Sequence, residues 1–371
     1  MSGGPPDFAA LGLLDGLQEP ARSSRTALLE SLYADGVALE ELQAAVADGR
    51  LALLPAELAL GGAGRRTARE VAAEVGVELG ALEAVRRASG LPLPPADVPA
   101  LGELDVFGAR ALAAFLEGGM PLDGLVEASR VFGEAAAHAA AAAGTLANTV
   151  LPQAGDTEVA YAQRLETAMR ELTPYAAELL GVLYLLHNRE NLRNEVVAAE
   201  ELASGRRSDV HDVSVGFCDV VGFTRLGEGV PAADLGAIAT RLAALAVDVA
   251  APPVRLVKTI GDAAMLVAPE PAPLLEAILA LMEAAEAEGE QFPQLHAGAA
   301  HGPALRRWGD YYGGPINLAA RLTERARPGA LITDAAVRER ADGAFAWSEA
   351  GIKRLKGMSE PTTVWRCRRA A

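Results

Sequence analysis

The segment Val254 to Val267 constrains the fold of this chain most strongly, because its pattern is typical of a β-hairpin with ionisable side chains at the bend. Two apolar, strand-like runs flank a short polar stretch that contains a glycine, which indicates two antiparallel strands joined by a tight turn. Lys258 and Asp262 both lie in that polar stretch. On their own they would be interpreted as an exposed ion pair at a turn.

Two further stretches place polar side chains in comparable positions. The segment 213–224 is an apolar strand that ends at Asp219 and continues into a glycine-containing turn. Because strand side chains alternate, Asp219 shares one face with Phe217. Farther along, a glycine-rich loop leads into a helix on which Asn317 and Arg321 are four residues apart and therefore share a face.

Together the three stretches resemble the catalytic domain of class III nucleotidyl cyclases, the adenylate and guanylate cyclases. The resemblance covers roughly residues 205–368, and six matching residue types in the right order make it specific. It implies that Asp219 and Asp262 hold two divalent cations, with the main-chain carbonyl of Val220 as a further ligand. Magnesium or manganese suits such an oxygen-only site.

The resemblance also implies which residues bind the nucleotide. Lys258 and Asp310 match the purine-reading pair, Asn317 matches the residue that orients the ribose, and Arg321 matches the residue that stabilises charge on the α-phosphate. The remaining contacts are to phosphate oxygens, and they are expected from the backbone amides of Gly222, Phe223 and Thr224, from Lys356, and from Arg306 or Arg307, between which the sequence does not choose.

The purine-reading pair favours adenine. A lysine donates to the N1 acceptor of adenine and an aspartate accepts from its N6 amino group, whereas guanine would set its O6 lone pairs against the carboxylate. The expected reaction is therefore the conversion of ATP to 3′,5′-cyclic AMP and pyrophosphate, by in-line attack of the ribose 3′ hydroxyl on the α-phosphorus. Guanylate cyclase activity is the alternative within the family.

Composition limits the partners of the chain. Its 371 residues predict two or three domains of ordinary size, each able to bury a core. A formal net charge of −16 argues against binding nucleic acid, since that affinity comes mainly from Lys and Arg on phosphates. Only Cys218 and Cys367 are present, too few for a disulfide framework, so we expect a cytoplasmic protein. Neither a secretory signal nor a membrane span is predicted.

The first half of the chain predicts an all-α domain. From Phe8 to about Asn191 nearly every segment is rich in Ala, Leu, Glu and Arg, with Gly and Pro breaks that predict eight to ten helices. Within it, residues 66–87 are similar to the helix-turn-helix of MerR-type regulators, with the turn at Gly76. Since the second helix would present Glu78 and small residues to a base edge, we favour a packing unit and keep a DNA-binding regulator as the alternative.

A near-heptad apolar stripe from Met169 to Leu202 predicts a long helix that leads toward the catalytic domain, and both a core helix and a dimer-contact or transmitting helix fit it. We predict a helical regulatory domain (1–190), a helical linker (191–210) and a catalytic domain (211–371). The arrangement resembles actinobacterial-type cyclases whose helical domain restrains the catalytic one and releases it at acid pH. His138, His187 and His211 are the candidate sensors, and structural roles fit them equally.

The second half predicts the order β, α, β, β, α, β followed by a tail, which indicates a ferredoxin-like α+β sandwich and agrees with the cyclase resemblance. In that family the active site lies between two catalytic domains. One of them supplies the metal carboxylates and the other supplies the purine-reading and transition-state residues. Because this chain has one such domain with the full set, the resemblance implies a homodimer with two equivalent sites.

Overall fold

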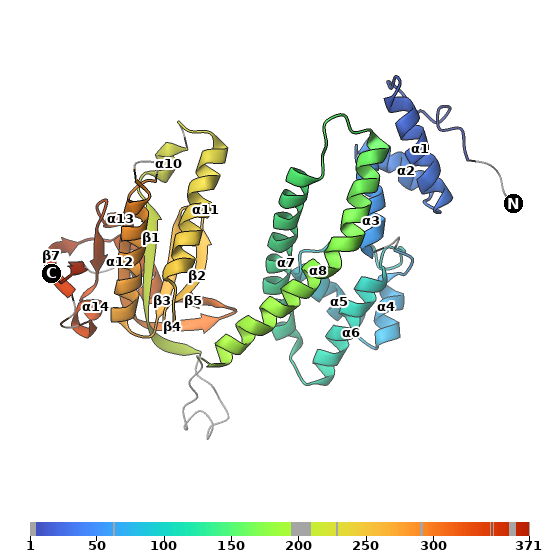
Figure 1. The fold of residues 1–371 in the computed structure, drawn as a ribbon. Helices are drawn as coiled ribbons and strands as arrows, with labels where there is room; N and C mark the ends of the chain where they lie inside the picture. The colour runs from blue at the N-terminus through green and yellow to red at the C-terminus, as the bar shows by residue number, and fades with distance from the viewer. Residues whose placement is uncertain are drawn as a thin grey trace. The chain divides into compact units, whose positions relative to one another are not determined.

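The structure is a computed structural model, and it describes residues 5–61, 64–193, 209–227, 229–289, 292–341, 343, 345–355 and 361–370. The chain divides into two compact units, 1–192 and 193–371, which are described separately (Figure 1). Lys356 and most of the predicted linker 191–210 lie outside the described residues. Among the helices that are described, none has the length and apolar character needed to cross a membrane.

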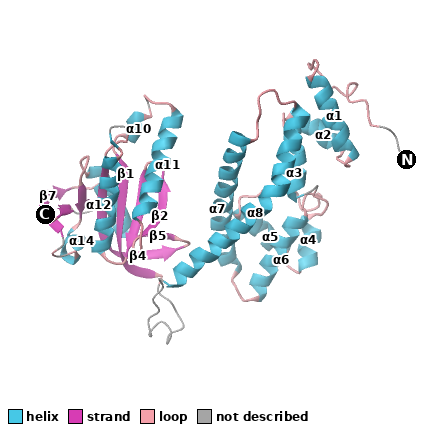
Figure 2. Cartoon of the chain, viewed as in Figure 1, coloured by secondary structure: helices cyan, strands magenta, loops and turns pink. Residues whose placement is uncertain are grey.

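The first unit is helical, as predicted (Figure 2). The proline-rich stretch 91–95 separates two of its helices, and Gly118 to Pro121 separates two others, because proline and a left-handed glycine both end helical hydrogen bonding. The helices in the described part of this unit are α1 (Ala21–Ala34), α2 (Leu39–Ala47), η1 (Leu51–Leu53), α3 (Leu54–Gly61), α4 (Ala68–Val75), α5 (Leu79–Ala88), α6 (Glu103–Glu117), α7 (Leu122–Val150) and α8 (Glu158–Arg193).

The second half of α8 is unusual because its large apolar side chains are exposed within the single chain. Their exposed fractions reach 70% at Tyr175 and 66% at Leu192. The predicted stripe is therefore present on the described part of the helix, and within the described residues most of its large side chains stay exposed, although the Phe132 ring of α7 contacts Tyr184.

The second unit is built on one mixed sheet. Its strands are β1 (Val210–Val220), β2 (Arg255–Ile260), β3 (Ala263–Ala268), β4 (Leu295–Arg307), β5 (Asp310–Tyr312), β6 (Leu331–Thr333), β7 (Phe345–Lys353) and β8 (Thr362–Arg369). Its helices are α10 (Phe223–Leu226), α11 (Ala232–Val249), α12 (Pro271–Ala287), α13 (Gly314–Arg325) and α14 (Ala335–Arg340).

The topology confirms the predicted ferredoxin-like sandwich. The strands are ordered β2-β3-β1-β4-β6-β8-β7, and the first four are antiparallel with α11 and α12 as their connections. Strand β6 then joins β4 in parallel, and β8 and β7 extend the sheet in antiparallel fashion. This tail corresponds to the additional strands expected after the core motif.

Alternation along β1 sorts its side chains onto two covered faces. Cys218 and Val220 pack with α11 and α12 in the larger core. Val213 and Val215 pack on the opposite face, against α13. Asp219 follows on that second face, where the strand ends.

The segment after His301 differs from the prediction. A glycine-rich loop was expected before the helix of Asn317 and Arg321, but β4 continues to Arg307 and pairs with β5 across a two-residue turn. A strand of three residues next to glycine-rich sequence is too short to give a clear alternation pattern, which explains the difference. Asp310 is therefore held in a sheet register opposite Arg307.

Candidate active site

The two predicted metal-binding carboxylates are neighbours. Asp219 lies opposite Ala263 in the pairing of β1 with β3, and Asp262 directly precedes Ala263 at the hairpin turn. The Val220 amide donates a hydrogen bond to the Asp262 carbonyl at 3.1 Å, which ties the hairpin turn to the end of β1. The strand end and the hairpin tip predicted from the sequence thus meet at one place.

The electrostatics of this pair fit a cation. The Oδ1 atom of Asp219 is buried and has no hydrogen-bond partner among the described residues. Partial burial, followed by the Asp219 charge, raises the pKa of Asp262 to about 6. Two carboxylates with an unsatisfied buried oxygen need positive charge nearby. The described residues contain no set of three acidic, His or Cys side chains able to hold a metal, so other oxygens would have to complete the ligand set.

His296 belongs to this group and was missed by the sequence reasoning. It lies opposite Asp219 in the β1–β4 register, with its Nε2 atom 3.6 Å from Asp219 Oδ2 and its Nδ1 atom 3.1 Å from the Ala326 carbonyl. The pKa of His296 is raised, chiefly by the Asp219 carboxylate. Its only signal would have been the ferredoxin-like strand order, which puts β4 beside β1.

The turn after β1 has the backbone geometry expected of a phosphate cradle. Gly222 has φ = 72°, in the left-handed region that favours glycine, and it precedes the single turn of α10. The amides of Phe223 and Thr224 donate to no described residue. Thr224 is exposed, as is Gly222, so both are accessible to a ligand.

The predicted purine-reading pair, Lys258 and Asp310, is in contact within one chain. The Lys258 ammonium donates to Asp310 Oδ2, and the other carboxylate oxygen of Asp310 accepts from the Tyr311 amide at 2.9 Å. The Lys258 side chain is 38% exposed and the Asp310 side chain is 26% exposed. A fixed donor and a fixed acceptor therefore stand side by side, accessible from solvent.

The predicted transition-state residues lie on α13. Asn317 is exposed, and Arg321 forms an ion pair with Glu324 one turn farther along, with Nη1 and Oε1 2.5 Å apart. None of the hydrogen bonds or ion pairs of the described residues joins α13, the Lys258–Asp310 pair and the carboxylate pair to one another. The structure thus brings the predicted residues into three separate groups.

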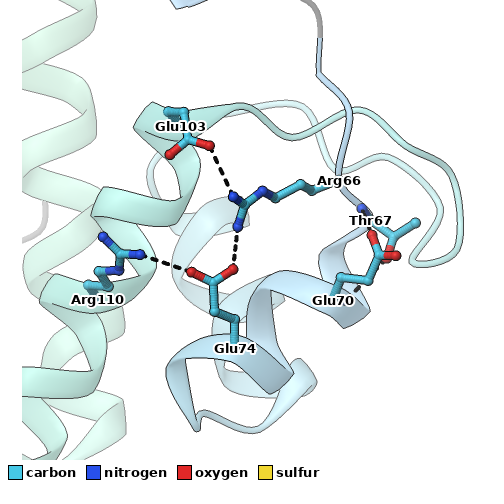
Figure 3. Close-up of polar contacts among 6 residues, drawn as sticks. All are labelled: Arg66, Thr67, Glu70, Glu74, Glu103 and Arg110. Carbon is cyan, nitrogen blue, oxygen red and sulfur yellow. Dashed lines mark hydrogen bonds and ion pairs between the residues drawn. The ribbon is translucent and has the colours of Figure 1, made fainter.

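The helix-turn-helix-like segment has the predicted form, with α4 and α5 joined at Gly76, whose φ is 74°. Three of its four arginines, Arg66, Arg69 and Arg86, contact carboxylates of the same unit. Arg66 pairs with Glu74 and Glu103, and Arg110 of α6 also contacts Glu74 (Figure 3).

Two further arginines of this segment also form ion pairs with carboxylates. Arg69 pairs with Asp97, and Arg86 pairs with Asp105. Thr67 and Glu70 form a capping box at the start of α4 (Figure 3). The Thr67 amide donates to Glu70 Oε2, and the Glu70 amide donates to Thr67 Oγ1. Three of the arginines that phosphate contacts would need are therefore used in ion pairs within this unit, which supports the packing interpretation.

Both halves of the chain are similar to known adenylate cyclases. Residues 6–192 match the family described as the adenylate cyclase regulatory domain. The chain is 38% identical to the pH-sensitive adenylate cyclase MT1302 of Mycobacterium tuberculosis, over 97% of this chain and 91% of that protein. It is 32% identical to an adenylate cyclase of Streptomyces coelicolor, over 78% of this chain and 75% of that protein. The chain therefore belongs to the family of adenylate cyclases that carry this helical regulatory domain.

Proposed function

We propose that the chain converts ATP to 3′,5′-cyclic AMP and pyrophosphate with two divalent cations, Mg²⁺ or Mn²⁺, in each site. The observation that carries the proposal is the Asp219–Asp262 pair, with its buried unpartnered oxygen, in a domain that also forms the Lys258–Asp310 pair. The family membership supports the same reaction. Both cysteines are buried and unpaired, which supports a cytoplasmic location.

The first group of residues would bind the metal ions and the phosphates. Asp219, Asp262 and the Val220 carbonyl would hold the ions, which when bound would supply the positive charge that lowers the pKa of the 3′ hydroxyl and offsets the triphosphate charge. The Phe223 and Thr224 amides hold phosphate oxygens after the left-handed turn at Gly222. Lys356, which lies outside the described residues, is proposed as a further phosphate contact, together with either Arg306 or Arg307.

The base and the transition state are assigned to the other two groups. Lys258 donates to N1 of adenine and Asp310 accepts from its N6 amino group, which selects ATP over GTP. Asn317 orients the ribose, and Arg321 stabilises the charge that develops on the α-phosphate, for which its pairing with Glu324 must loosen.

A homodimer is part of the proposal. The three groups of residues are formed separately within one chain, so a second copy is proposed to bring the metal carboxylates of one subunit to the base-reading and transition-state residues of the other. The exposed apolar side chains of α8 support a second copy as well, since a chain with such a surface gains from covering it.

Regulation by the helical unit completes the proposal. We assign residues 1–190 to a regulatory domain, 191–210 to a linker and 211–371 to the catalytic domain, with restraint that is released at acid pH. The candidate sensors His138, His187 and His211 are all exposed in the single chain. Activity of the full chain should be compared with that of a shortened protein beginning near Ser204, between about pH 5.5 and 8. Equal activities with parallel profiles would exclude both restraint and acid release.

The central test is direct. Purified protein is incubated with ATP and Mn²⁺ or Mg²⁺, and cyclic AMP is identified by chromatography and mass spectrometry, with GTP in parallel. Asp219→Ala should abolish turnover and weaken Mn²⁺ binding measured by electron paramagnetic resonance, with an unchanged circular dichroism spectrum. Asp212→Ala, at an exposed position on the same strand, is the matched control. Wild-type turnover by folded Asp219→Ala protein would remove the two-metal mechanism.

A further inference from the structure

Trp308 has a backbone conformation that its side chain disfavours. It occupies the two-residue turn between β4 and β5 with φ = 53°, and the next residue, Gly309, has φ = 79°. Among the described residues other than glycine, Trp308 is the one with a positive φ. Turns with two such residues favour Asn-Gly, because asparagine tolerates the left-handed region and a bulky side chain does not.

Packing does not explain the strain. The Trp308 side chain is among the exposed large apolar residues, with 40% of its surface accessible. The Arg307 guanidinium makes a cation–π contact with the indole, with its Cζ atom 5.8 Å from the ring centroid. An exposed indole on a strained turn is destabilising on two counts, and such positions are found where function requires them.

The location of the turn indicates what the function is. Asp310 follows Trp308 by two residues, so their Cα atoms are at most about 7 Å apart. The Asp310 carboxylate contacts Lys258, and together they form the proposed base-reading pair. An adenine that donates to Asp310 would therefore lie within reach of an indole on this turn.

We propose that Trp308 is a positioning residue for the purine base and that its indole stacks on the adenine that Lys258 and Asp310 read. This inference rests on the proposed function. An aromatic ring offers contact area to the flat face of the base, which hydrogen bonds at the base edge do not use. Stacking of this kind typically contributes about 5- to 150-fold in affinity, and we expect about tenfold here because the ring stays partly exposed.

Three variants separate the ring from the backbone strain. Trp308→Phe keeps an aromatic ring and the disfavoured backbone. Trp308→Leu keeps bulk and strain but removes the ring. Trp308→Asn removes the ring and relieves the strain, so its melting temperature should rise by about 2–4 °C. Loss of substrate affinity together with a gain of stability is the combination that a purely structural role does not produce.

The measurements are the KM and kcat for ATP, and the affinity for 3′-deoxyATP, which lacks the attacking hydroxyl, measured by isothermal titration calorimetry so that removing the tryptophan does not remove the signal. We expect Trp308→Leu and Trp308→Asn to raise KM and the dissociation constant about tenfold with kcat changed less than threefold, and Trp308→Phe to stay near wild type. Values within twofold of wild type for all three would overturn the inference while leaving the proposed function intact.

Two other outcomes are distinguishable. If light scattering shows that activity falls in step with loss of the dimer, Trp308 is an interface residue and the inference is wrong. If wild-type protein neither binds 3′-deoxyATP nor forms cyclic AMP, the proposed function itself fails, and the inference fails with it.

Discussion

The Lys258–Asp310 contact shows how a single pair of side chains can set a choice of base. A carboxylate is acceptor-only and an ammonium is donor-only, so neither group can adapt to a base that presents the opposite pattern. The Tyr311 amide and the Lys258 ammonium each occupy one carboxylate oxygen, and this fixes the orientation of the Asp310 side chain. In the proposed site, the choice between adenine and guanine would therefore depend on the acceptor-only character of Asp310.

Asp310→Asn is expected to narrow the preference for ATP. The amide keeps the shape of the side chain but adds an N–H donor that tolerates the O6 acceptor of guanine. The ratio of kcat/KM for ATP to that for GTP should fall by about tenfold to a hundredfold, as measured by initial rates with each nucleotide. Equal losses for ATP and GTP would show that Asp310 does not read the base.

The sequence predicted most of the candidate site residues but did not predict His296 or Trp308. Asp219 and Asp262 stand at the strand end and the turn that were predicted, because alternation and glycine positions are local signals. Lys258 lies within β2 and Asp310 within β5, rather than in the predicted bend and loop. His296 was missed because its partner Asp219 is 77 positions earlier and only the sheet register brings them together. Trp308 was missed because a positive φ has no sequence signal when the residue is neither Gly nor Asn.

At the scale of elements, α13 is positioned by a close approach to β4. A Cβ atom built on Gly298 would lie 2.3 Å from the Thr323 amide nitrogen and 2.6 Å from the Ala319 carbonyl oxygen. Both atoms belong to the backbone of α13, which carries Asn317 and Arg321. The absence of a side chain at position 298 thus allows α13 to pack this closely on β4.

Gly298→Ala should therefore displace α13 and impair both stability and turnover. Overpacking against backbone costs about 1–3 kcal/mol, and kcat should fall by more than tenfold because Arg321 moves with the helix. Gly216→Ala is the matched control, since its nearest atom at 2.4 Å is the Cδ1 tip of the flexible Ile278 side chain. Thermal unfolding and kcat are measured for both variants, and equal effects would contradict this account of the helix.

Asp334, the N-cap of α14, is expected to make the stability of the fold depend on pH. Asp334 accepts from the Val337 amide at 2.9 Å and is 7% exposed, and burial raises the pKa of its carboxyl to about 6. A raised pKa means that the folded state favours the protonated form. The associated stability is fully present below the unfolded-state pKa, near 3.8, and is lost as pH rises through about 6.

Asp334→Asn removes this titration and keeps an oxygen that can accept from the Val337 amide. The unfolding free energy of wild type, measured relative to that of the variant, should therefore decrease by about 2 kcal/mol between pH 4 and 7. Urea unfolding of both proteins at several pH values measures this difference. A difference that stays constant with pH would show that Asp334 titrates normally in the folded protein.

The elements themselves were predictable to different degrees. Helices in the first unit follow from long runs of helix-favouring residues broken by glycine and proline, and the core of the second unit follows from its β, α, β, β, α, β order. The extension of β4 and the short β5 were not predictable, because a three-residue strand is stabilised by its partner rather than by its own pattern. Whether the α8 stripe was buried or exposed depended on neighbours that the sequence does not reveal.

For the whole molecule, the exposed stripe of α8 and the three separate groups of site residues lead to the same hypothesis, that the working unit is a homodimer. In that arrangement Asp262 and Lys258, which belong to one β-hairpin, serve different active sites. Each site would need the carboxylates of one chain and the helix α13 of the other. Variants that damage different halves of the site should therefore complement each other.

Asp262→Ala and Arg321→Ala should each be inactive alone, but co-expressed chains should recover about a quarter of wild-type activity. Random pairing makes about half of the dimers mixed, and a mixed dimer has one site with both lesions and one intact site. Differently tagged chains allow the mixed dimers to be purified, and these should reach about half of wild-type activity. Asp262→Ala with Asp219→Ala is the matched control, because both lesions affect the carboxylate half and no site is restored. If purified mixed dimers of the first pair are as inactive as the single variants, each site is built within one chain.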